Sequence, residues 1–97
     1  MLTSKQRAGL RTLANPLETI AQIGKGGITD AVVAQLDEAL EARELIKVRV
    51  LESALLSARE ACDALVRPLR AEPVQCIGTR FVLYRKNPKN PKIELAK

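Results

Sequence analysis

The apolar residues of this chain change their spacing several times, and this alternation constrains the fold more than any other feature. Spacings of three and four residues predict helices, whereas spacings of two in runs of branched residues predict strands. The predicted elements, alternately helix and strand with a strand pair at the end, span residues 2–15, 18–23, 29–43, 45–51, 53 to about 66, 74–77 and 80–85. The alternation implies crossover connections and at least one parallel strand pair, while the turn residues Gly78 and Thr79 join the last two strands in an antiparallel hairpin. The sequence therefore predicts an α/β (α+β) fold of order α-β-α-β-α-β-β, with helices packed on a mixed four-stranded sheet.

Capping and breaking residues predict where the helices begin and end. Thr3 and Gln6 have the spacing of a capping box at the start of the first helix, and Pro16 ends that helix. Ser53 is a suitable cap for the third helix, and Pro68 is expected to end it near residue 66 or 67. The third helix is expected to bury a stripe of five residues, Leu55, Ala58, Cys62, Leu65 and Leu69.

The length and composition indicate one globular domain over residues 1–97. Of the 97 residues, 46% are hydrophobic, which is too many for a disordered chain. We expect the basic, proline-containing tail, residues 86–97, to be loosely held. No apolar run approaches the length of about 18 residues that a membrane span needs, and the N-terminal residues do not resemble a signal peptide.

The chain contains no histidine, and this absence limits its chemistry. It excludes a Ser-His-Asp triad, a histidine general base and a histidine-ligated metal. The two cysteines, Cys62 and Cys76, cannot complete a four-ligand zinc site, and we expect them to be small core residues without a disulfide. We therefore expect neither an enzyme nor a cofactor, and no small-molecule substrate.

The net charge of +5 is unevenly distributed. Residues 1–29 and 64–97 are basic, whereas residues 30–63 hold eight acidic and four basic residues. If the fold brings the basic ends together, one face is positive and suits a polyanion such as nucleic acid. The acidic residues include an exposed face on the second helix, formed by Asp37, Glu38, Glu41 and Glu44. That face is either simply solvated or, as an alternative function, docks a basic protein partner.

A glycine-rich loop, residues 24–27 with the sequence Gly24-Lys25-Gly26-Gly27, separates a predicted strand from a helix that Thr29 can cap. Glycines let a phosphate approach the backbone, and a helix N-terminus favours an anion. The loop fits neither the Walker A pattern nor the dinucleotide pattern, because Thr29 stands where the latter needs its third glycine. It does fit the G-x-x-G loop of KH-type domains, which clamps a nucleic-acid backbone.

Further basic residues could extend a contact with RNA. The candidates, which lie on the first helix and on the predicted strands, are Lys5, Arg7, Arg11, Lys47, Arg49, Arg80 and Arg85. The only aromatic residues are Phe81, which we expect in the core, and Tyr84, which the sequence leaves undecided. Because base-stacking platforms are scarce, we expect contacts with phosphates and with the shape of folded or double-stranded RNA.

Four stretches in the same order resemble the CRM (chloroplast RNA splicing and ribosome maturation) domain, and in particular its stand-alone YhbY-type bacterial members. They are residues 2–7 (LTSKQR), 23–30 (IGKGGITD), 44–49 (ELIKVR) and 77–85 (IGTRFVLYR). The resemblance implies a domain related to the C-terminal domain of bacterial translation initiation factor three, with residues 24–27 contacting RNA. Pro68 is a departure from the family, whose members usually carry the third helix further, and it leaves the end of that helix open.

For a single-domain bacterial member, the resemblance implies association with precursors of the large ribosomal subunit and a role in their assembly. Multi-domain plant relatives act instead in organellar intron splicing. We therefore expect a cytoplasmic, monomeric protein whose partner is ribosomal RNA in the large-subunit precursor.

Overall fold

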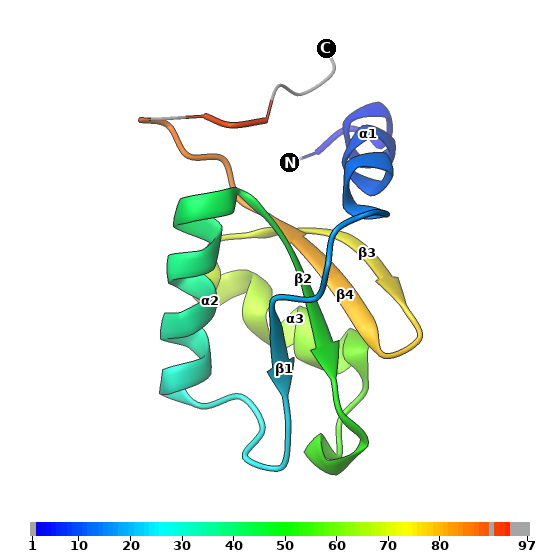
Figure 1. The fold of residues 1–97 in the computed structure, drawn as a ribbon, viewed down its shortest axis with the longest axis vertical. Helices are drawn as coiled ribbons and strands as arrows, with labels where there is room; N and C mark the ends of the chain where they lie inside the picture. Colours follow the sequence, from blue (N-terminus) through cyan, green and yellow to red (C-terminus); the bar gives the residue numbers. More distant parts are fainter. Residues whose placement is uncertain (1, 90, 94–97) are drawn as a thin grey trace.

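The computed structural model describes residues 2–89 and 91–93. Its elements in chain order are α1 (Ser4–Ala14), β1 (Ala21–Ile23), α2 (Asp30–Arg43), β2 (Leu45–Val50), the 3-10 turn η1 (Glu52–Ala54), α3 (Ala58–Leu69), β3 (Glu72–Ile77) and β4 (Arg80–Tyr84). The strands form one sheet of order β1-β2-β4-β3 (Figure 1). β1 and β2 are parallel, and the other two pairs are antiparallel. The α+β fold with a mixed four-stranded sheet is thereby confirmed.

The predicted caps of the first two helices are present. The Thr3 hydroxyl accepts a hydrogen bond from the Gln6 backbone N–H, and the Gln6 side chain accepts one from the Thr3 N–H. The Thr29 hydroxyl accepts a hydrogen bond from the Val32 N–H at the start of α2. These bonds satisfy backbone donors that a helix terminus leaves without partners, so both helices begin where the sequence indicates.

The predicted start of the third helix at Ser53 is wrong. Residues 52–54 form η1, which Leu55 ends in the left-handed conformation at φ +58°. The helix instead begins after Ser57, which forms a capping box with Glu60. Leu55 was expected in the buried stripe but is 93% exposed, because it lies before the helix and not on it. The other four members of that stripe are buried.

The predicted end of the third helix is also wrong, because α3 continues through Pro68 to Leu69. A proline here removes one hydrogen bond to the carbonyl four residues earlier, on Ala64. Ala64 is exposed, so water can solvate that carbonyl. The helix then stops at Arg70, whose positive φ of +54° reverses the chain.

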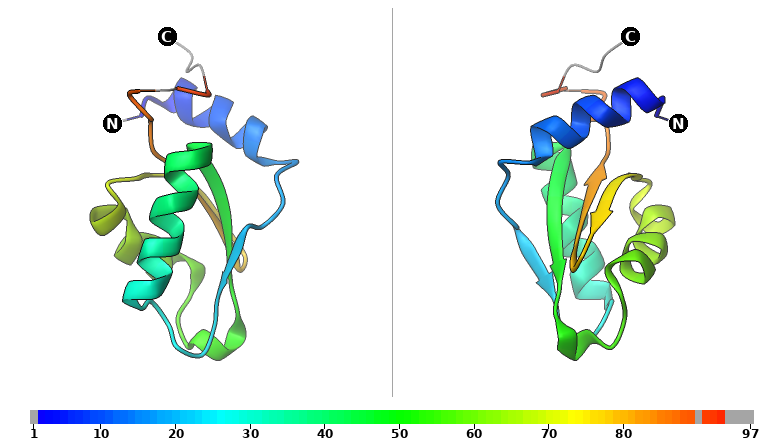
Figure 2. Two further views of the ribbon diagram at one scale, coloured as in Figure 1. Left: turned by 60° about the vertical axis from the view of Figure 1, so that its left-hand side comes forward. Right: turned by 90° about the vertical axis from the view of Figure 1, so that its right-hand side faces the viewer.

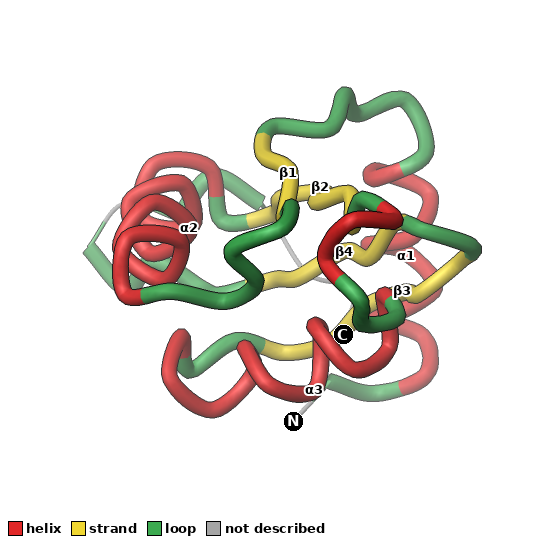
Figure 3. Tube along the Cα trace, turned by 90° about the horizontal axis from the view of Figure 1, so that it is seen from below, coloured by secondary structure: helices red, strands yellow, loops and turns green. Residues whose placement is uncertain are grey.

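The sheet separates two apolar clusters. Viewed along the strands, α2 and α3 lie on one side of the sheet and α1 on the other (Figure 3). The larger cluster packs Phe81, Ile46 and Val48 under α2 and α3. The smaller cluster packs Leu10 and Ala14 of α1 on the opposite face, against residues that include Leu45, Val82 and Tyr84. Phe81 and Tyr84 are thus both buried, so neither offers a stacking platform.

Asn87, Lys92 and Ile93, in the described part of the predicted tail, are hydrogen-bonded to Glu44 at the end of α2, and the prediction that the tail is loosely held stays a prediction. Glu44 was assigned to the exposed acidic face but is completely buried. Its carboxylate accepts hydrogen bonds from the backbone N–H groups of Asn87, Lys92 and Ile93, at 2.6, 2.5 and 2.8 Å. Residues 90 and 94–97 of the predicted tail lie outside the described residues.

The described residues contain few groups suited to nucleophilic chemistry or to metal binding. Cys62 and Cys76 are free, and burial raises the pKa of the Cys62 thiol to about 11, so it is not a nucleophile at neutral pH. Within residues 2–89 and 91–93, no group of three His, Cys, Asp or Glu side chains is placed to hold a metal ion. In the same part of the chain, no helix has the length and apolar character needed to cross a membrane.

Candidate nucleic-acid interface

The glycine loop (residues 24–27) is a tight turn at the end of the molecule opposite α1 (Figure 1). The Gly27 N–H donates a hydrogen bond to the Gly24 carbonyl at 2.8 Å. Gly27 has φ +69°, a value that residues with a side chain rarely adopt, so the turn itself requires this glycine. Lys25 is exposed at the turn. The loop therefore presents backbone and one cation at the start of α2.

The other two glycines of this loop are not required by the fold. A Cβ on Gly24 would meet Leu51 and Ser53 at ordinary contact distances of 3.6 and 3.8 Å, and one on Gly26 would be 3.9 Å from Thr29. Neither glycine has a positive φ. Their lack of side chains leaves the backbone accessible from outside, which is the property that a phosphate contact needs.

The face of the sheet that carries α1 divides into a covered half and an open half. Figure 2 shows α1 across one end of the sheet only. Two rows of side chains cross β2, β4 and β3 in register from the edge of α1 outward, and Val82 in the first row is still buried in the cluster that includes α1. The first row is Lys47, Val82 and Gln75, and the second is Arg49, Arg80 and Ile77. We call these six residues the open half; Gln22 of β1 lies opposite Arg49 and extends the second row.

Two arginines face each other directly in the open half. Arg49 and Arg80 are partners in the β2–β4 register, and both are exposed. The neighbouring pair, Val50 and Thr79, is hydrogen-bonded, so Arg49 and Arg80 occupy the closer type of pair, with Cα atoms about 4.5 Å apart. Like charges at such positions destabilise a sheet. An anion bound between the two guanidinium groups would remove that repulsion.

Five acidic residues lie on the helices that cover the opposite face of the sheet. Asp37, Glu38 and Glu41 are on α2, and Glu60 and Asp63 are on α3, both of which cover the opposite face of the sheet. Lys47, Arg49 and Arg80 have no acidic partner in the strand register. These five carboxylates are thus kept away from the open half, whereas Glu18 is nearer, because it lines a hollow together with Lys47.

The remaining predicted site residues are placed differently. Lys5 and Arg11 are exposed on α1, whereas the Arg7 Nε donates a hydrogen bond to the Pro73 carbonyl at 3.1 Å and ties α1 to β3. Arg85 lies between α2 and α3, where it pairs with Asp37 at 2.6 Å and Glu41 at 3.3 Å and donates to the Leu69 carbonyl. The structure does not bring Arg85 to the open half.

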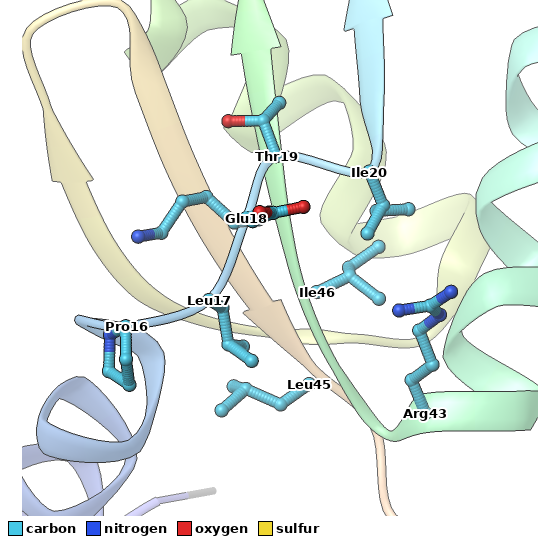
Figure 4. Close-up of a pocket in the computed structure, with 9 residues that line it drawn as sticks. Pro16, Leu17, Glu18, Thr19, Ile20, Arg43, Leu45 and Ile46 are labelled. Carbon is cyan, nitrogen blue, oxygen red and sulfur yellow. The ribbon is translucent and has the colours of Figure 1, made fainter.

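A hollow lies beside the connection from α1 to β1 (Figure 4). There Leu17 points toward Leu45, while Glu18 and Arg43, which also line the hollow, carry opposite charges. Because the lining is of mixed charge, we do not include this hollow in the interface; it adjoins the interface through Lys47.

Sequence reasoning missed Gln75 and Ile77 as members of this face. The period of two along β3 places them on one side, but only the pairing with β4 puts them beside Lys47, Arg49 and Arg80. The start of α3 could have been found, since Ser57 and Glu60 have the spacing of a capping box.

These features define an α+β domain with a glycine loop and one cationic sheet face. The chain matches the model of the CRS1 / YhbY (CRM) domain over residues 2–85, and it belongs to that family. It is 47% identical over 95 residues to the probable RNA-binding protein YqeI of Bacillus subtilis, covering 98% of this chain and 99% of the relative. It is 38% identical over 84 residues to an RNA-binding protein of Haemophilus influenzae, covering 87% and 85%. The solution structure of a hypothetical protein from Staphylococcus aureus is similar, with a TM-score of 0.79, 43% identity, and coverage of 99% and 100%.

Proposed function

We propose that this chain is a non-catalytic RNA-binding protein that assists assembly of the large ribosomal subunit. The observation that carries RNA binding is the open half of the sheet, where Lys47, Arg49 and Arg80 gather without an acidic partner in the strand register. The glycine loop adds accessible backbone and Lys25. Relatives named as RNA-binding proteins support RNA as the polyanion.

The role in ribosome assembly rests on the resemblance to stand-alone bacterial members of the family. The partner is ribosomal RNA in the large-subunit precursor, bound in the cytoplasm by a monomer without a cofactor. Binding uses the RNA backbone and its folded shape, because both aromatic side chains are buried.

The alternative, docking of a basic protein on the acidic face of α2, has less support. Of the four carboxylates proposed for it, Asp37 and Glu41 already pair with Arg85 and Glu44 is buried. A partner would have to compete with these internal bonds.

The salt dependence of affinity for a large-subunit ribosomal RNA fragment tests the RNA contact. Affinity falls as salt rises, and each phosphate contact makes the slope of log affinity against log salt steeper by about 0.7–0.9. Lys25→Ala should therefore make this negative slope shallower by about one. Arg67→Ala, which removes the same charge from exposed α3, is the matched control and should leave the slope unchanged. An equal loss in both variants, or no salt dependence in the wild type, would contradict the proposal.

Sedimentation of cell lysate in a sucrose gradient tests the ribosomal role. The wild-type protein should travel with large-subunit particles, and a variant with Lys25→Asp and Gly26→Asp should stay at the top. A wild-type protein that stays at the top at low salt would show that the assembly role does not apply to this chain.

A further inference from the structure

The open half of the sheet contains a small hollow between the end of α1 and the β3–β4 hairpin. Its lining comes from three strands and one helix end, and comprises Asn15, Lys47, Gln75, Ile77, Arg80 and Val82. Its volume of about 180 Å³ is below the range of roughly 300–1,000 Å³ that drug-sized ligands occupy. A single planar ring system is therefore a more suitable occupant than an extended ligand.

The floor and one wall of this hollow are apolar. Val82 is buried, with 2% of its surface exposed, and lies directly between Lys47 and Gln75 in the first row. Ile77, by contrast, is 66% exposed on the neighbouring position of β3, although it is a large apolar residue. An apolar floor and an exposed isoleucine give a flat ring van der Waals contact on its face, in the absence of an exposed aromatic side chain.

The rim of the hollow is polar and cationic. Gln75 and Asn15 carry amide groups, each of which offers a donor and an acceptor side by side, the arrangement that pairs with the edge of a base such as adenine. The Lys47 ammonium donates a hydrogen bond of 3.4 Å to the backbone carbonyl oxygen of Asn15, which holds this lysine at the rim. Arg80 stands on the other side, next to Arg49.

We propose that this hollow receives one unpaired base of the bound RNA, with Lys47 and Arg80 holding the flanking phosphates and Gln75 reading the base edge. The proposal rests on the proposed function and adds to it a base-specific contact, whereas the glycine loop contacts backbone alone. RNA, a polyanion, is the expected ligand because every charged residue that lines the hollow is a cation. The preferred RNA is then a folded segment that carries an unpaired nucleotide, and adenine is the expected base.

The test compares two RNA hairpins that differ only by one unpaired adenosine in the stem. The wild-type protein should bind the hairpin with the unpaired base about tenfold more tightly, which is the scale of one good base-edge contact. Gln75→Leu and Ile77→Ser should each remove most of that preference, so that the affinities for the two hairpins become similar. Both residues are at least partly exposed, so circular dichroism should show folded variants.

Gln22→Leu is the matched control, because Gln22 is the same residue type on the same sheet face but outside the hollow. It should keep the wild-type preference. Equal wild-type affinity for both hairpins, or an equal loss in Gln22→Leu, would overturn the inference and leave RNA binding intact. Failure to bind either hairpin would overturn the proposed function as well. A dimer that Ile77→Ser dissociates would assign the hollow to a second copy of the chain and would also overturn the inference.

Discussion

The covered half and the open half of one sheet face show how similar strands serve two purposes. Leu45 and Tyr84 lie opposite each other under α1, and both are buried. Two residues further along the same strands, Lys47 and Val82 begin the open half, and the next pair is Arg49 and Arg80. The backbone pairing is continuous, so only the side chains and the cover change. The covered half stabilises the fold through buried apolar contacts. The open half instead holds Arg49 and Arg80, whose mutual repulsion opposes folding, so these charges are explained by RNA binding and not by stability.

The largest difference between the halves should appear in stability. Leu10 of α1 is 1% exposed in the covered half, so Leu10→Ala should lower the free energy of unfolding by about 3 kcal/mol. Ile77→Ala in the open half should change it by less than about 0.5 kcal/mol. Urea denaturation measures both. Similar losses in the two variants would show that the open half also belongs to the core.

The buried carboxylate of Glu44 beside the covered half should give the next largest effect. Burial raises its pKa, but three backbone N–H donors and the charge of Lys86 together lower the pKa below its ordinary value of 4.5. The carboxylate therefore stabilises the fold above about pH 4.5, and this contribution is lost as the pH falls through the lower, folded-state pKa.

Glu44→Gln should cost about 2 kcal/mol at neutral pH, because hydrogen bonds to a charged group are replaced by weaker ones. Urea denaturation between pH 3 and pH 7 should show a smaller pH dependence in Glu44→Gln than in the wild type. Glu38→Gln, on exposed α2, is the control. Parallel pH profiles for wild type and Glu44→Gln would mean that the buried carboxylate does not contribute as described.

Two adjacent glycines of the glycine loop should differ in whether they affect stability or RNA binding. Gly27→Ala forces a side chain into a positive φ and should cost about 1 kcal/mol of stability. Gly26→Ala has room for its Cβ and should leave the stability unchanged, yet it should weaken RNA binding by obstructing the backbone. Thermal unfolding together with fluorescence anisotropy distinguishes the two. Unchanged RNA affinity in Gly26→Ala would exclude a close approach of phosphate at that residue.

The smallest expected effect concerns the facing arginines. Arg49→Thr removes the repulsion with Arg80 and should raise the free energy of unfolding by about 0.2–1 kcal/mol, while RNA affinity falls. The gain in stability should decrease at high salt, because screening already reduces the repulsion. A loss of stability on this substitution would show that the pair does not oppose folding.

The sequence predicted the order and type of the elements well, because each has a local signal. The capping box of Thr3 and Gln6, the hairpin turn at Gly78 and the spacing of apolar residues all act within a few positions of the chain. The start of α3 was predicted four residues too early because Ser53 and Ser57 both suit a helix cap, and only Ser57 has Glu60 as its capping-box partner.

The features that sequence reasoning missed depend on distant parts of the chain. Glu44 continues the acidic pattern of α2, but its burial depends on backbone N–H groups more than 40 residues away. The open half depends on the register of three strands, which places Gln75 beside Val82 and Arg49 beside Arg80. The RNA contacts assigned to the glycine loop and the basic residues remain predictions.

Mapping RNA contacts by nuclear magnetic resonance tests the central claim most directly. Amide chemical shifts would be followed while a hairpin with one unpaired adenosine is added to the isotope-labelled protein. The account predicts that the shift changes cluster on the glycine loop and on the open half, around Lys47, Arg49, Gln75 and Arg80. Changes centred on the outer surfaces of α2 and α3, with the open half unaffected, would contradict it.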